Sequence, residues 1–361
     1  MRRRFTPRPA WPVISRRRLC LLASATTACR GVAAAAPARF PGMAWDEVRP
    51  DRSGWSAPRL AQAIGQAQRL GSTAIVVVQH GVIVASWGEA SANILLNSAR
   101  KSLLSALIGI AAARGQIHLT DTLAQLGIDD MPPALTAAEK RATVRDLLEA
   151  RSGIYHAANY ETQEMQTQRP ARGSHAPGTY WFYNNWDFNA LGAIYEHAVG
   201  APIFTAFARQ IATPTGMQDF DPAQCRYVDG AASRYPAYLF HASARDLARF
   251  GLLFLRQGRW GDRQIIPAAW VRESTQPWFP TTRRTGYGYL WWTLAPDGPS
   301  RVQAPPGTFW AEGQGGQIVF VAPADDIVVV HLARDHLGRR GVSVTSALRL
   351  MELILAARPG A

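Results

Sequence analysis

The chain has 361 residues, of which 47% are hydrophobic and 18% are charged, and its formal net charge is +13. This composition excludes a disordered or collagen-like polymer, because the apolar content suffices for one large core or two smaller ones. The positive charge does not indicate a nucleic-acid-binding protein, since eight arginines and no acidic residue or lysine lie in residues 1–36, which leaves +5 on the other 325 residues.

Residues 1–36 have the pattern of an export signal. Arginines at 16–18 precede an apolar run at 19–28, and alanines at 33–36 suit a cleavage site. Paired arginines before such a run resemble a twin-arginine signal, and the run is shorter than the roughly 20 residues of a membrane-spanning helix. We therefore expect an exported, periplasmic protein without a membrane span, in which residues 37–361 form a single domain.

Two of the three cysteines, Cys20 and Cys29, lie in this expected signal. Cys29 is a weak candidate for lipid attachment, because Thr26 stands where such signals usually carry an aliphatic residue. Only Cys225 would remain after cleavage, so no internal disulfide is expected.

The first elements after this segment are a helix and a hairpin. Helical spacing of apolar residues predicts a helix over 57–70, closed by Gly71. Two β-rich runs at 73–78 and 82–87 flank a short turn and predict a β-hairpin.

The middle of the chain is dominated by helical patterns. Helices are predicted over 98–114, 143–150, 186–199 and 243–257. The last begins with Ser243 and Asp246, which we expect to form a capping box through the serine hydroxyl and the aspartate carboxylate.

The C-terminal part mirrors the N-terminal one. Strands are predicted over 288–293, 317–322 and 326–333, and a helix over 343–357. We therefore predict an α/β (α+β) fold with one antiparallel sheet flanked by the terminal helices, and with a mainly helical lobe inserted. The sheet lobe would hold residues 44–97 and 285–361, and the helical lobe residues 98–284.

Ser98 and Lys101 stand at the start of an apolar helix. Residues three apart share one helix face, so the Lys101 amine can reach the Ser98 hydroxyl. A buried lysine has a lowered pKa and can accept the proton of the serine, while the helix N-terminus favours an oxyanion beside Ser98. The alternative is a capping serine followed by a solvated lysine.

Two further motifs give weight to that pair. Tyr183 precedes the helix over 186–199, where its phenol could act as a general base, and the Asn185 amide could bond the lysine and a substrate carbonyl. Gly313 precedes a strand, where the backbone N–H of Gln314 could join that of Ser98 in an oxyanion hole. A plain turn feeding a hairpin is the alternative for residues 311–317.

The segments that carry these residues resemble one enzyme family. In order and spacing, NSARKSLLSALIGIA, PGTYWFYNNWDFNALG, SARDLARFGLLFLRQGRWGDRQIIP, YGYLWW and GQGGQIVFVAP are similar to class C β-lactamases, D,D-peptidases, related esterases and 6-aminohexanoate-dimer hydrolases. The resemblance implies a β-lactamase-like fold and a covalent acyl-enzyme on Ser98, with Lys101 as its partner and Tyr183 as general base. It also implies that Asn185 and Gly313 bind substrate. The sequence has no His-Glu-x-x-His, Cys-x-x-Cys or Gly-x-Gly-x-x-Gly motif, so we expect neither a metal nor a cofactor.

The third motif departs from that of the β-lactamases. Ala311-Glu312-Gly313 stands where those enzymes carry Lys-Thr-Gly, so the motif supplies no cation for the carboxylate of a β-lactam. We therefore expect a small-molecule ester or linear amide as substrate. Tryptophans 181, 186, 292 and 310 could line a site for an apolar acyl group or belong to the core.

Other functions remain open at this point. β-Lactamase or D,D-peptidase activity is one alternative, and an inactive relative that binds peptidoglycan or a peptide is another. The residues also leave open whether the Lys101 amine or the Tyr183 phenolate takes the proton of the serine.

Overall fold

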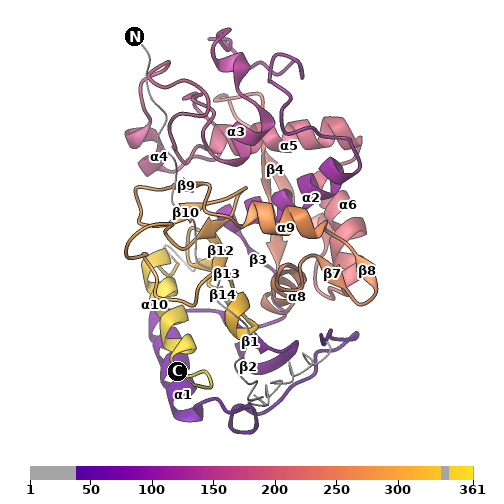
Figure 1. Cartoon of the computed structure of the whole chain (residues 1–361), viewed down its shortest axis with the longest axis vertical. Helices are drawn as coiled ribbons and strands as arrows, with labels where there is room; N and C mark the ends of the chain where they lie inside the picture. The colour runs from indigo at the N-terminus through magenta and orange to yellow at the C-terminus, as the bar shows by residue number, and fades with distance from the viewer. Residues whose placement is uncertain (1–37, 335–340, 361) are drawn as a thin grey trace, which may run out of the picture. The chain divides into compact units, whose positions relative to one another are not determined.

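The computed structural model describes residues 38–334 and 341–360, and residues 38–361 form one unit (Figure 1). The expected export signal, with Cys20 and Cys29, lies outside the described residues. None of the described helices is long and apolar enough to cross a membrane.

Helices and strands follow one another along the chain much as the sequence predicts. The helices are α1 (Ala57–Leu70), α2 (Arg100–Ala113), α3 (Val144–Leu148), α4 (Gln163–Gln168), α5 (Asn185–Val199), α6 (Ile203–Phe207), α7 (Thr213–Thr215), α8 (Ala244–Leu255), α9 (Ala268–Ser274) and α10 (Val344–Leu355). The longer strands are β1 (Ala74–Gln79), β2 (Val82–Gly88), β12 (Phe309–Gly313), β13 (Gln317–Ala322) and β14 (Ile327–Leu332). The shorter strands are β3 (Ile94–Leu95), β4 (Arg226–Val228), β5 (Ala237–Leu239), β6 (His241–Ala242), β7 (Arg259–Trp260), β8 (Arg263–Gln264), β9 (Phe279–Pro280), β10 (Gly286–Tyr287) and β11 (Trp292–Thr293).

The main sheet joins the two ends of the chain, as predicted. Its eight strands lie in the order β2-β1-β14-β13-β12-β11-β10-β9, and all its neighbouring strands are antiparallel. The first hairpin meets the last one where β1 pairs with β14, with Ala74 opposite Leu332. The predicted α+β fold with an antiparallel sheet is therefore confirmed.

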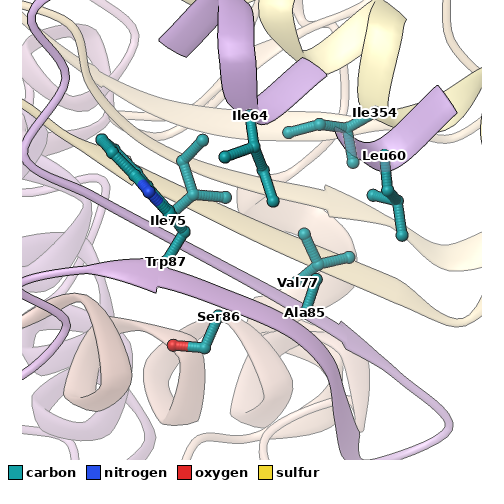
Figure 2. A pocket seen from close by; sticks show the side chains of 8 residues that line it. All are labelled: Leu60, Ile64, Ile75, Val77, Ala85, Ser86, Trp87 and Ile354. Atoms are coloured by element: carbon teal, nitrogen blue, oxygen red, sulfur yellow. The ribbon is translucent and has the colours of Figure 1, made fainter. Parts of the chain in front are cut away.

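Helices cover both faces of this sheet. Gly251 of α8 lies so close to one face that a Cβ atom added there would be 2.5 Å from Val328 and 3.2 Å from Val319. Strand side chains alternate between faces, so Ile75 and Val77 of β1 point the other way. Figure 2 shows both of them beside side chains of α1 and α10. These two terminal helices pack against each other and form the helical layer on this face.

The helix α2 lies at the centre of the helical part. Every residue from Arg100 to Ala111 is buried, and the helix packs against α5, α6, α9 and β12. The apolar residues on every side of α2 are therefore part of the hydrophobic core. A short 3-10 turn, η2 (Asn97–Ala99), precedes it, so the predicted helix over 98–114 begins with this turn and ends one residue early.

The predicted strand over 288–293 is wrong in its first four residues. Only Trp292–Thr293 is a strand there, because Leu290 adopts a left-handed conformation with φ 63° and its N–H donates to the carbonyl oxygens of Leu148 and Gly288. The sheet is instead extended by β10 and by β9, which lies at residues 279–280, inside the stretch expected to be helical.

The predicted capping box at the start of α8 is half correct. Ser243 Oγ accepts a hydrogen bond from the N–H of Asp246 at 3.2 Å. The Asp246 carboxylate, however, accepts from the N–H groups of Gln218, Asp219 and Phe220 and not from that of Ser243. This carboxylate therefore fastens a distant loop to α8.

Candidate active site

The turn η2 and the first turn of α2 carry the predicted nucleophile and its lysine. Asn97 adopts a left-handed conformation with φ 47°, which asparagine tolerates better than most residues, and Ser98 follows it. Lys101 Nζ donates to Ser98 Oγ at 2.7 Å, as the spacing of three residues predicts. Lys101 is 1% exposed, so the alternative of a solvated lysine is wrong.

Tyr183 joins Ser98 and Lys101 as the third member of this group. It lies just before α5, whose first turn is capped by the Asn184 side chain. Lys101 Nζ donates a second hydrogen bond to the Tyr183 hydroxyl at 2.8 Å, so one amine contacts both predicted partners. Its nitrogen also lies 4.6 Å from the centre of the Tyr183 ring and 4.8 Å from that of Phe188.

Burial sets the ionisation of these groups. It lowers the pKa of Lys101 well below the ordinary value, and the neighbouring Arg100 cation lowers it further. Burial raises the pKa of Tyr183 to about 12, against the opposing effects of its hydrogen bond with Ser98 and of Arg100. The folded site thus favours the neutral amine more strongly than water does, and it keeps the phenol un-ionised near pH 7, an arrangement that suits an amine that accepts a proton.

The third motif lies directly against the turn that carries Ser98. A Cβ atom added to Gly313 would be 2.2 Å from the carbonyl oxygen of Leu96 and 3.0 Å from the N–H nitrogen of Ala99. Only glycine allows this approach of β12 to η2. The segment after Gly313 is also a turn that leads into β13, so it serves both the hairpin and the site.

Asn97 ties the third motif to the site. Its Nδ2 donates to the carbonyl oxygen of Gln314 at 2.7 Å, and its Oδ1 accepts from the Tyr160 hydroxyl at 2.8 Å. The sequence reasoning did not single out this residue, although an asparagine just before a candidate nucleophile is a signal for left-handed backbone.

Asn185 lies near the site but contacts other atoms than expected. It is 2% exposed, and its Nδ2 donates to the carbonyl oxygen of Tyr160 at 2.5 Å. The side-chain hydrogen bonds of Lys101 go to Ser98 and Tyr183 instead. Through Tyr160 and Asn97, a chain of hydrogen bonds runs from Asn185 to the turn of the third motif.

Aromatic side chains surround Tyr183. The ring of Trp292 stacks on it at 5.5 Å between centroids, and those of Phe188, Tyr287 and Trp181 lie at 4.9, 6.0 and 6.5 Å. The four tryptophans at 181, 186, 292 and 310 are all buried. Two of them support the tyrosine, and the other two bind carboxylates, as Trp186 Nε1 donates to Asp130 and Trp310 Nε1 to Glu312.

Glu312 of the third motif is held by arginines that the sequence reasoning missed. Its Oε1 lies 3.5 Å from Arg301 Nη1 and 3.9 Å from Arg283 Nη1, and its Oε2 accepts from Trp310. The Arg283 guanidinium lies 5.6 Å from the centre of the Trp292 ring, one aromatic layer from Tyr183. The motif carries no cation itself, but loops between β9 and β12 bring two cations to it.

Comparisons with known proteins concern the chain as a whole. The family model described as beta-lactamase matches residues 57–348. A putative 6-aminohexanoate-dimer hydrolase from Bacillus anthracis is 19% identical with a TM-score of 0.62, over 88% of this chain and 87% of that one. A putative beta-lactamase from Bacteroides dorei is 19% identical with a TM-score of 0.64, over 84% of this chain and 99% of that one.

A third solved structure is that of EstCE1, described as a hydrolase with promiscuous acyltransferase activity. It is 18% identical with a TM-score of 0.61, over 84% of this chain and 99% of that one. These likenesses show the fold that the chain shares with them. No curated protein matches the chain.

Proposed function

Because the chain belongs to the beta-lactamase family, we propose that it is a serine hydrolase that cleaves an ester or a linear amide through a covalent acyl-enzyme on Ser98. The observation that carries the proposal is the pair of hydrogen bonds from Lys101 Nζ, at 2.7 Å to Ser98 and at 2.8 Å to Tyr183. An inactive relative that only binds a peptide would not need a buried amine between these two hydroxyls.

In the proposed acylation step, Ser98 Oγ attacks the carbonyl carbon of the substrate and its proton passes to Lys101 Nζ. The lowered pKa of Lys101 leaves the amine able to accept that proton. The backbone N–H groups of Ser98 and Gln314 would donate to the oxygen that becomes negatively charged, since Gly313 brings β12 against η2.

The leaving group then needs a proton. Tyr183 retains its phenolic proton at neutral pH and contacts Lys101, so it can donate to the departing oxygen or nitrogen and be reprotonated by the lysine. In the second half-reaction water attacks the acyl carbon and the bond between that carbon and Ser98 Oγ breaks. The proton of the water passes along the same groups to Ser98 Oγ, and the carboxylic acid leaves.

The surroundings of the third motif support esters or linear amides over β-lactams. Ala311 stands in place of the lysine of the β-lactamase motif, and the carboxylate of the next residue, Glu312, already engages Arg301 and Arg283. Arg283 also pairs with Glu164, so a β-lactam carboxylate would find both arginines already paired with carboxylates and lack a free cation for a charge-assisted hydrogen bond.

The test is labelling with a fluorophosphonate probe, followed by intact mass and peptide mapping. A single adduct on Ser98, absent in Ser98→Ala, supports the proposal, and no adduct or an adduct elsewhere overturns it. A panel of chromogenic esters, linear amide oligomers, D-Ala-D-Ala peptides and a cephalosporin then ranks the substrate classes. Preferred turnover of the cephalosporin would contradict the proposed preference.

We also propose that the enzyme is exported to the periplasm as a single domain. The arginine-rich residues 1–36 support this. Cell fractionation, with the N-terminus of the recovered protein determined by mass spectrometry, tests it.

A further inference from the structure

Arg100 is a buried cation without an acidic partner. Its side chain is 0% exposed, and within residues 38–334 and 341–360 it forms no ion pair. Its Nη1 donates to the carbonyl oxygen of Asn97 at 3.0 Å, while no described residue accepts from its Nε or Nη2. A charge buried in this way is costly, so its retention beside the candidate nucleophile calls for a reason.

Aromatic rings hold this guanidinium. Its central carbon lies 5.1 Å from the centre of the Tyr238 ring and 5.7 Å from that of Tyr160. A guanidinium is weakly hydrated, stacks on such rings and keeps its proton when buried, whereas a lysine in the same place would lose its proton. Position 100 therefore carries a permanent positive charge.

On the basis of the proposed function, we propose that Arg100 is a positioning residue whose buried, unpaired guanidinium favours the unprotonated amine of Lys101, so that the amine can accept the proton of Ser98. The two cations would be adjacent residues of one buried helical turn, where like charges repel strongly. Release of a proton from Lys101 relieves the repulsion. Arg100 accordingly lowers the pKa of Lys101, and it lowers that of Tyr183 as well.

The other charged groups near Lys101 and Tyr183 have opposite effects on the pKa of Tyr183. From β12, Glu312 raises the pKa of Tyr183, and from the loop between β9 and β10, Arg283 lowers it. These two side chains face each other at 3.9 Å, so their effects largely cancel. Tyr238 of β5 and Tyr287 of β10 have raised pKa values and are neutral near pH 7. Beside burial, which has the larger effect, Arg100 is thus the charged group that lowers the pKa of Lys101.

The experiment measures the rate at which a fluorophosphonate labels Ser98 between pH 5 and pH 10. It compares the wild type with Arg100→Met, which lacks the charge, and with Arg100→Gln, which lacks the charge but keeps an amide donor toward the Asn97 carbonyl. We expect the acidic limb of the profile to move to higher pH in both variants. Labelling at pH 7 should slow about tenfold or more and recover as the pH rises.

Arg249→Met is the matched control. Arg249 of α8 is 1% exposed, and its guanidinium donates to the backbone carbonyls of Thr215 in α7 and of Gly42 and Met43 in the segment before α1. This variant should lose stability but keep the wild-type acidic limb. An unmoved limb in whichever Arg100 variant folds overturns the inference, even if labelling is slower at every pH. Absence of Ser98 labelling in the wild type would overturn the proposed function itself.

Discussion

The Asn97 side chain donates to the carbonyl oxygen of Gln314 at 2.7 Å, so the residue before the candidate nucleophile is fastened to the residue expected to supply the second oxyanion donor. These two segments are far apart in the sequence. Their spacing, on which the stabilisation of an oxyanion depends, therefore rests on one side-chain amide and on the absence of a side chain at Gly313.

Replacement of Asn97 should separate these contributions. Asn97→Gly permits the left-handed backbone but removes the amide, and we expect about tenfold slower acylation from one lost hydrogen bond. Asn97→Ala also opposes the positive φ and should be slower still and less stable by about 1–2 kcal/mol. Labelling rates and thermal unfolding of the two variants check this, and equal behaviour of both would contradict it.

Gly313→Ala should disable the site through a steric clash. The added methyl would stand 2.2 Å from the Leu96 carbonyl oxygen, so β12 must withdraw from η2, and we expect at least ~10²-fold slower turnover. Gly65→Ala is the control. Gly65 lies in α1, and the added methyl would be 3.6 Å from the Arg69 side chain, which is an ordinary contact distance. That variant should retain full activity.

Tyr183→Phe should keep the fold, because the ring contacts with Trp292 and Phe188 remain. Loss of the hydroxyl should slow acylation by ~10²-fold or more, as for other general acid–base groups. Single-turnover kinetics with a chromogenic ester measure the effect. An unchanged rate would remove Tyr183 from the proposed mechanism.

Lys101→Met should abolish acylation and stabilise the protein at pH 7. The pKa of Lys101 is lower in the folded chain than its ordinary 10.5, so between those values the unfolded chain binds more protons and the wild type gains stability as pH rises. The Tm of the variant should exceed that of the wild type by a few degrees at pH 7, and this difference should shrink toward pH 10.5. Thermal unfolding at both pH values tests this, and a variant less stable than wild type at pH 7 would refute it.

Glu312→Gln should alter substrate preference. It would leave Arg301 and Arg283 without their shared carboxylate, and the added positive potential should raise kcat/KM for an anionic ester several-fold relative to a neutral one of equal length. Glu164→Gln is the control, since Glu164 is exposed and, among the described residues, forms its one ion pair with Arg283. The same change of preference in both variants would contradict a specific role for Glu312.

The central group of the site could be predicted because its signals are local. The spacing of Ser98 and Lys101 follows from one helical turn, and the resemblance of the flanking segments indicated Tyr183 and Gly313. The roles of Arg283 and Arg301 could not be predicted, because these residues reach Glu312 from irregular loops whose path no periodicity describes.

Errors in the fold have the same origin. A sequence pattern predicted a continuous strand through Leu290, where long-range hydrogen bonds hold a left-handed turn. Asp246 satisfied the capping-box pattern, yet three amides of a loop nearly thirty residues earlier occupy its carboxylate. In both cases partners distant along the chain determine the local conformation.

The pairing of β1 with β14 affects folding of the chain during its synthesis. During synthesis the first hairpin emerges early, but its buried strand β1 has no neighbour on one side until the end of the chain is complete. An apolar strand with one open edge is prone to self-association, and pairing between remote segments folds slowly. Ser98, the candidate nucleophile, and Lys101 can come together within one helical turn, whereas Gly313 and β12 are synthesised much later. The candidate site is therefore completed late, and a chain that stops before β14 is expected to be both aggregation-prone and inert.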